Sequence, residues 1–167
     1  MIAGRFQNLG SAGDSLAVVV STFWAEQGKG ETPLVVAIIP NGAPVALPVA
    51  AALGVRAESL SLNRTDCGVD VDHLPDVAGR TVIVIDDGVE TGTVARCVIA
   101  AMRAGGAARV ILAVPVCSRE VLAPLALMYD DVIAVVKPLA RRSLAWHFDD
   151  FDTIDDARAH AVLAAQG

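Results

Sequence analysis

The sequence predicts an α/β fold in which a doubly wound, mostly parallel sheet is flanked by helices within one domain, residues 1–167. Short runs rich in Val, Ile and Leu alternate along the chain with stretches of helical spacing. These runs have no polar face, which is the pattern of parallel strands buried on both sides. Hydrophobic residues make up 54% of the chain and aromatic residues only 4%, so we expect an aliphatic core.

The first half of the chain alternates helix and strand twice. Apolar residues at helical spacing predict two helices, and Gly28 and Gly54 end them. An unbroken apolar run predicts the first strand, an alternating run predicts the second, and a polar stretch containing Gly68, Pro75 and Gly79 predicts a loop. The expected elements are a helix over residues 11–28, a strand over 34–39, a helix over 43–53, a strand over 56–63 and a loop over 64–80.

The second half continues the same alternation. Four consecutive β-branched residues start it, and each later apolar run is followed by a helical pattern or by a polar turn. The tail from Pro138 onward is mixed in character until its last helical stretch. The expected elements are a strand over residues 81–86, a helix over 94–104, a strand over 110–116, a helix over 119–127, a strand over 132–136 and a final helix over 155–165.

Charge and composition exclude several classes of protein. The net charge is −6 and no run of Lys or Arg occurs, so we expect no nucleic-acid binding. No apolar stretch is long and clean enough to span a bilayer, and the first residues lack a leader pattern, so a cytoplasmic protein is expected. The spacing of Cys67, Cys97 and Cys117 fits neither a zinc site nor a disulfide framework. Cys97 and Cys117 are expected to be buried, while Cys67 lies in the polar loop, where its thiol is free to react.

The most informative segment runs from Val82 to Thr93. An apolar strand leads into Asp86 and Asp87, and a turn rich in Gly and Thr then leads into a helix. Open α/β sheets bind ligands at the carboxyl ends of their strands. The carboxylates there can accept hydrogen bonds from hydroxyl groups or hold Mg²⁺. The helix N-terminus offers N–H groups to a phosphate. Together these groups suit a phosphorylated sugar.

Other interpretations of this segment are weaker or less specific. Two Asp residues after a strand also occur as a polar turn and helix cap, and Asp-Gly is a common turn dipeptide. The Asp-x-Asp-x-Thr order of HAD-type phosphatases is absent. The chain also contains no Gly-x-Gly-x-x-Gly, no P-loop motif and no Gly-x-Ser-x-Gly elbow.

The segment Val82–Thr93 resembles the 5-phosphoribosyl-1-pyrophosphate (PRPP) motif of type I phosphoribosyltransferases. The resemblance implies that Asp86 and Asp87 contact the ribose hydroxyls, directly or through Mg²⁺, and belong to the catalytic centre. Glu90 is either a general base or a helix cap. The resemblance further implies that the ribose 5-phosphate is bound by Gly88, Val89, Glu90, Thr91, Gly92 and Thr93.

Two further segments lie where this family contacts pyrophosphate. Asn41 and Gly42 follow the first expected strand, although Asn41 stands where the family commonly has Lys or Arg, and an ordinary strand-to-helix turn is the alternative. The resemblance implies a cis peptide between Pro40 and Asn41. Residues 64–80 lie where the family has a mobile catalytic loop but look short, and Arg64 either contacts pyrophosphate or is a solvated loop residue.

The tail is similar to the ending of a group of bacterial phosphoribosyltransferase-like proteins, where it forms a small C-terminal hood over the acceptor base. Lys137 and Trp146 are the hood candidates, and Trp146 either stacks on a base or packs against the sheet. Arg141 and Arg142 either supply phosphate charge or form a surface patch.

The resemblance implies Mg²⁺-dependent transfer of the 5-phosphoribosyl group of PRPP to a nitrogenous base with release of pyrophosphate. The expected small-molecule partners are therefore PRPP and a nucleobase or nucleoside monophosphate. A regulatory module of the same fold that binds PRPP or a nucleotide remains open, as does a phosphosugar hydrolase. The apolar residues 122–128 and the habits of the family favour a homodimer.

Overall fold

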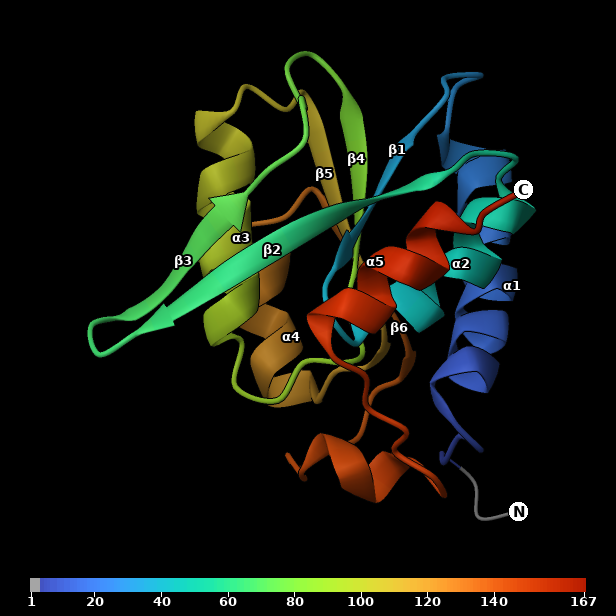
Figure 1. Cartoon of the computed structure of the whole chain (residues 1–167), viewed down its shortest axis with the longest axis vertical. Helices are drawn as coiled ribbons and strands as arrows, with labels where there is room; N and C mark the ends of the chain where they lie inside the picture. The colour runs from blue at the N-terminus through green and yellow to red at the C-terminus, as the bar shows by residue number, and fades with distance from the viewer. Residues whose placement is uncertain (1–3) are drawn as a thin grey trace.

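The computed structural model describes residues 4–167, and the strands in this part of the chain form one six-stranded sheet in the order β3-β2-β1-β4-β5-β6 (Figure 1). The strands are β1 (Leu34–Ile38), β2 (Ala57–Thr65), β3 (Gly68–His73), β4 (Thr81–Ile85), β5 (Arg109–Val116) and β6 (Asp131–Val136). The helices are α1 (Leu9–Gln27), α2 (Gly42–Ala52), α3 (Thr93–Ala104), α4 (Arg119–Ala126) and α5 (Asp156–Ala164), with a 3₁₀ turn, η1, at Leu144–His147. The α/β fold expected from the sequence is confirmed.

The central strands are parallel and buried along their whole length. β1 pairs with β2 and β4, and β4 pairs with β5, all in the same direction. Every residue of β1 and of β4 is buried. This explains why their sequences are continuously apolar, because each strand has a helical layer on both faces.

Two separate cores lie on the two faces of the sheet. Ile83 and Ile85 of β4 face the core that packs against α1, α2 and α5. Val82 and Val84 face the other core, which is formed with α3 and α4. Figure 1 shows these helices on opposite sides of the sheet. The chain therefore leaves β1 towards one face and β4 towards the other, and a crevice forms where these neighbouring strands end.

The predicted loop over residues 64–80 is wrong for its first half. β2 continues to Thr65, the chain turns at Gly68 with φ of +133°, and β3 returns antiparallel along the sheet edge. Figure 1 shows this hairpin projecting from the body of the molecule. Its strand signal is the alternation of Val and Asp over residues 69–72, which places the valines on one side. Val71 packs against the α3 core, and the Cys97 thiol donates a hydrogen bond to the Val69 carbonyl at 3.0 Å.

The segment after β6 returns to the start of the chain. Phe148 lies 5.7 Å from Phe6, ring centre to ring centre, and Asp152 accepts a hydrogen bond from the Leu9 N–H at 3.0 Å. Cys117 is buried, Cys97 is partly exposed and Cys67 is exposed on the hairpin. Among residues 4–167, no helix combines the length and the apolar character that crossing a membrane requires.

Candidate functional site

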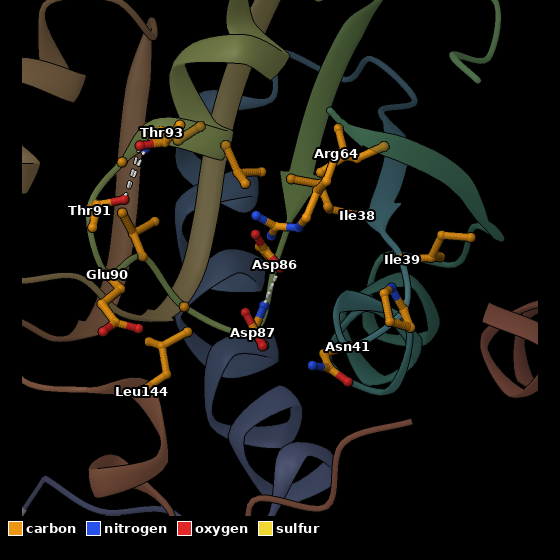
Figure 2. A pocket seen from close by; sticks show the side chains of 17 residues that line it. Ile38, Ile39, Asn41, Arg64, Asp86, Asp87, Glu90, Thr91, Thr93 and Leu144 are labelled. Atoms are coloured by element: carbon orange, nitrogen blue, oxygen red, sulfur yellow. Dashed lines mark hydrogen bonds between the residues drawn. The ribbon is translucent and has the colours of Figure 1, made fainter. Parts of the chain in front are cut away.

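A pocket of about 540 Å³ lies at the carboxyl ends of β1 and β4 (Figure 2). It brings the predicted sugar-phosphate segment, the loop after β1 and two residues of the hairpin, Leu62 and Arg64, together in a single cavity. Its lining consists of Ile38, Ile39, Pro40, Asn41, Leu62, Arg64, Asp86, Asp87, Gly88, Val89, Glu90, Thr91, Gly92, Thr93, Val94, Ala95 and Leu144.

Asp86 and Asp87 form the floor of this pocket. The Asp87 N–H donates a hydrogen bond to Asp86 Oδ1 at 2.8 Å, and Asp87 is 8% exposed. Burial, followed by the charge of the neighbouring Asp87, raises the pKa of Asp86 well above its ordinary value. Burial also raises the pKa of Asp87, although hydrogen bonds from Asp86 and Asn41 act in the opposite direction. Two neighbouring carboxylates, one buried and one half-buried, favour a positive or hydrogen-donating ligand that relieves their repulsion.

The loop over residues 88–93 presents backbone N–H groups beside these carboxylates. The Val89 N–H bonds to the Val116 carbonyl at 2.8 Å, which joins the loop to the end of β5. Within residues 4–167, the N–H groups of Glu90, Thr91 and Gly92 donate to no protein acceptor. The hydroxyls of Thr91 and Thr93 lie 3.1 Å apart at the start of α3. This arrangement of unpaired donors at a helix N-terminus is suited to an anion.

The 3₁₀ turn η1 covers one side of the loop through Leu144. A Cβ on Gly88, whose φ is +150°, would lie 2.5 Å from Leu144 Cδ2. Leu144 is therefore a pocket residue that the sequence analysis missed. No sequence motif marks Leu144 as a pocket residue, because its position depends on how the tail folds back onto the sheet.

The loop after β1 lies against the carboxylate pair. A Cβ on Gly42 would lie 2.9 Å from the Ile85 carbonyl oxygen, so glycine allows α2 to start close to β4. Asn41 Oδ1 accepts a hydrogen bond from the Ile154 N–H at 3.0 Å, and Figure 2 shows the Asn41 amide beside Asp87. The expected cis peptide between Pro40 and Asn41 is wrong, since the cis bond among residues 4–167 joins Ile39 to Pro40.

Arg64 and Glu90 stand at the rim of the pocket. Arg64 is carried by β2 of the hairpin, and its guanidinium points towards Asp86 in Figure 2. Its charge opposes the rise in the pKa of Asp86, although burial dominates. Glu90 is exposed in the loop between Asp87 and Thr91. The structure thus brings both rim residues to the cavity that contains the carboxylate pair.

The two hood candidates lie outside the pocket lining. Lys137 is exposed, and its charge lowers the pKa of Cys117 against the larger effect of burial. Trp146 is 41% exposed, and the guanidinium of Arg142 lies 4.5 Å from its ring centre. Arg141 pairs with Glu120 at 3.5 Å. Leu144 of the same C-terminal segment does line the cavity.

The carboxylate pair can contribute to a magnesium site but does not form a complete one. Among residues 4–167, no group of three or more His, Cys, Asp or Glu side chains is arranged to hold a metal ion. Mg²⁺ commonly binds through one or two carboxylates together with substrate phosphates and water. Asp86 and Asp87 therefore fit an ion that arrives with a phosphorylated substrate.

Comparisons with known proteins identify the family of this chain. The profile of the phosphoribosyl transferase domain matches residues 19–136. Two relatives from strains of Mycobacterium tuberculosis, each named "Putative phosphoribosyl transferase", are 32% identical over 103 residues. These matches cover 58% of this chain and 23% of each relative, so the chain spans about a quarter of the length of the curated relatives it matches.

Solved structures share the fold at low sequence identity. The protein TT1426 from Thermus thermophilus has a TM-score of 0.79 and 22% identity, covering 98% of this chain and 99% of its own. The hypoxanthine-guanine phosphoribosyl transferase of L. donovani has a TM-score of 0.58 and 15% identity, covering 87% of this chain and 92% of its own. The purine phosphoribosyltransferase of Pyrococcus horikoshii has a TM-score of 0.56 and 15% identity, covering 78% and 90%. Because the family profile matches well over half of the sequence, this chain belongs to the phosphoribosyl transferase domain family.

Proposed function

We propose that this protein transfers the 5-phosphoribosyl group of PRPP to a nitrogenous base and releases pyrophosphate. The observation that carries the proposal is the single cavity in which the carboxylate pair Asp86 and Asp87 adjoins the unpaired N–H groups of residues 90–92. A phosphorylated ribose has hydroxyls for the first group and a phosphate for the second. The family membership supports phosphoribosyl transfer in general, and the acceptor base remains part of the proposal.

The proposed reaction breaks the bond between C1 of the ribose and the pyrophosphate oxygen and forms a bond between C1 and a base nitrogen. The loop over residues 88–93 would hold the 5-phosphate, and Asp86 and Asp87 would bind the ribose hydroxyls. As positive charge develops at the ribose ring, the two carboxylates stabilise it. The base nitrogen loses a proton, for which Glu90 is the acceptor that lies in the loop. Leu144 and the apolar residues near it would limit water at the reacting carbon.

Mg²⁺ would be held by Asp86 and Asp87 together with substrate oxygens, and it would neutralise negative charge on the pyrophosphate. Arg64 is the cation that the protein itself offers at this end of the cavity. Gly42 would offer its N–H group there, next to the carboxylates. We keep the assignments of Lys137 and Trp146 to the base site as predictions, although neither lines the cavity.

A module that binds PRPP or a nucleotide without turnover is the second candidate. One observation favours it: Asn41 stands in the pyrophosphate loop, and its Oδ1 is already bonded to the Ile154 N–H. A neutral side chain engaged within the protein supplies less stabilisation to a departing pyrophosphate than a free cation would. The two candidates share the ribose-phosphate site and differ in catalysis.

Calorimetric titration of the wild-type protein with PRPP and Mg²⁺ tests the shared site. Asp87→Asn should weaken ribose binding and Thr91→Val should weaken phosphate binding, each about tenfold or more, because a charge-assisted or buried hydrogen bond is lost. Arg103→Gln is the matched control, since Arg103 pairs with Asp130 at the far end of α3. No binding by the wild-type protein at millimolar PRPP would contradict both candidates.

A pyrophosphate-release screen over nucleobases then separates the candidates. Turnover at roughly 1–10³ s⁻¹ supports the transferase and excludes the binding module. Binding without pyrophosphate release for any base supports the module. The cytoplasmic location expected from the sequence stays a prediction.

A further inference from the structure

Arg96 lies one turn into α3 and reaches back to the loop that precedes the helix. Its Nη1 donates a hydrogen bond to the Thr91 carbonyl oxygen at 3.2 Å. Arg96 is exposed, and within residues 4–167 it is paired with no carboxylate. A positive charge with no acidic partner is therefore directed at one backbone carbonyl of the loop over residues 88–93.

The contact with this carbonyl determines the direction of a neighbouring donor. The Thr91 carbonyl and the Gly92 N–H belong to the same peptide unit, which is trans, and the two groups of a trans peptide point in opposite directions. When Arg96 holds the carbonyl on the side of α3, the Gly92 N–H must point to the other side of the loop. Gly92 lines the cavity, and its N–H donates to no protein acceptor within residues 4–167.

Two side chains also pack closely against Gly92. It is buried, its φ is +86°, and a Cβ on it would lie 3.0 Å from Arg96 Nη1 and 3.1 Å from Val121 Cγ1. The guanidinium and the Val121 side chain thus contact the same face of Gly92. This packing leaves the peptide between Thr91 and Gly92 little freedom to rotate.

We propose that Arg96 is a positioning residue for the phosphate site: it fixes the Thr91–Gly92 peptide so that the Gly92 N–H faces the ligand's phosphate, and it places a positive charge behind that donor. A charged donor on the carbonyl also polarises the peptide and strengthens its N–H as a donor. The charge matters because Asp86, Asp87 and Glu90 line the same cavity. The inference rests on the proposed function for the identity of the ligand as a ribose 5-phosphate.

The probe is ribose 5-phosphate, with ribose as the unphosphorylated comparison. Arg96→Gln should weaken ribose 5-phosphate about three- to tenfold and leave ribose unchanged, since only the phosphate contact is affected. Arg96→Lys keeps the charge and should fall between Arg96→Gln and the wild type. Arg103→Gln, on the same helix and away from the loop, should bind as the wild type does.

The amide signal of Gly92 supplies a readout that a general loss of stability would not move. Ribose 5-phosphate should shift the ¹⁵N–¹H resonance of Gly92 in the wild-type protein, and Arg96→Gln should reduce this shift at saturating ligand. In a turnover assay, Arg96→Gln should raise KM for PRPP and leave kcat unchanged, because the phosphate is bound equally before and during the reaction.

Each outcome has a defined meaning. A Gly92 resonance that ribose 5-phosphate leaves unchanged in the wild type, or an affinity that is the same in Arg96→Gln, overturns the positioning role. Equal losses in Arg96→Gln and Arg103→Gln also overturn it. Arg96-dependent binding without pyrophosphate release for any base overturns the transferase proposal alone.

Discussion

Asn41 Oδ1 accepts a hydrogen bond from the backbone N–H of Ile154 at 3.0 Å, across 113 positions of sequence. A backbone N–H can only donate, so the Asn41 amide oxygen must face Ile154 and its NH₂ group is left for the other side. On that side lies Asp87, whose pKa the Asn41 hydrogen bond lowers against the effect of burial. Asn41 thus connects the carboxylate floor of the pocket with the segment that leads into α5.

Asn41→Ala should therefore affect both stability and binding. We expect the free energy of unfolding to fall by about 1–2 kcal/mol, because the partly buried hydrogen bond to the Ile154 N–H is lost and the amide no longer lies beside Asp87. PRPP affinity should fall in parallel. Asp152→Ala is the control, since it removes the bond to the Leu9 N–H from the same tail without touching the pocket. Urea unfolding and calorimetry check both variants, and unchanged PRPP affinity in Asn41→Ala would contradict the connection.

Asp86→Asn should stabilise the ligand-free protein at neutral and alkaline pH. Burial, and then the Asp87 charge, raises the pKa of Asp86 in the folded state above its unfolded value. The folded state therefore binds the proton more tightly, and stability declines as pH rises through the raised pKa. Asn is neutral at every pH and can still accept the Asp87 N–H through Oδ1.

Thermal unfolding without Mg²⁺ at about pH 5 and about pH 8 tests this expectation. The Tm of Asp86→Asn should exceed that of the wild type at the higher pH, and the gap should narrow at the lower pH. PRPP affinity should meanwhile fall about tenfold or more. If the Tm difference between Asp86→Asn and the wild type widens as the pH is lowered, the pKa of Asp86 is not raised in the folded state.

Gly88→Ala should destabilise the protein by about 1–3 kcal/mol. The new methyl group would lie 2.5 Å from Leu144 Cδ2, and the φ of +150° is unfavourable for any residue with a Cβ. Leu144→Ala removes the close contact with the new methyl group but leaves the unfavourable φ. In a double-mutant cycle by urea unfolding, Leu144→Ala should cost less stability in the Gly88→Ala background than in the wild type. If the stability losses of the two substitutions simply add, the methyl group at position 88 does not clash with Leu144, because η1 shifts without cost.

We expect a homodimer in which residues 122–128 take part. Leu127 is 89% exposed and Met128 is 38% exposed at the end of α4, which leaves apolar surface in water. Burying such residues between subunits is favourable by about 25 cal/mol per Å² of apolar area. Light scattering at micromolar concentration should give the mass of two chains, and Leu127→Glu should give the mass of one. A monomeric wild type would remove the expectation.

The sequence predicted most of what lies along a single stretch of chain. The order of β4, the carboxylate pair, the loop and α3 is continuous from Val82 to Thr93, and its residue types suffice to place it at the end of a buried strand. The hairpin was missed because a polar stretch containing Gly68, Pro75 and Gly79 suggested a loop. The alternation of Val69 and Val71 with acidic neighbours was the signal that would have identified β3.

The predicted pyrophosphate and hood residues show where local pattern stops being sufficient. Asn41 lies beside the pocket as expected, yet its hydrogen bond to Ile154 depends on a tail that folds back over the molecule. Trp146 drew attention as an aromatic residue, but its neighbours are Arg142 and Arg5, and it does not line the cavity. Leu144, two positions earlier, lies against Gly88 at the cavity instead, and no sequence feature marks it.

By itself, the sequence determined the alternation of strands and helices and the placement of Asp86, Asp87 and the loop over residues 88–93 at one strand end, because hydrophobic periodicity and turn chemistry act over neighbouring residues. Only the tertiary structure decided which distant groups complete the site: Leu144 over Gly88, Ile154 on Asn41, and Arg64 above Asp86. Those contacts arise from how the two helical layers, the hairpin and the tail pack around the sheet. Packing of segments far apart in the chain depends on the shape and burial of all of them together, and no local pattern encodes it.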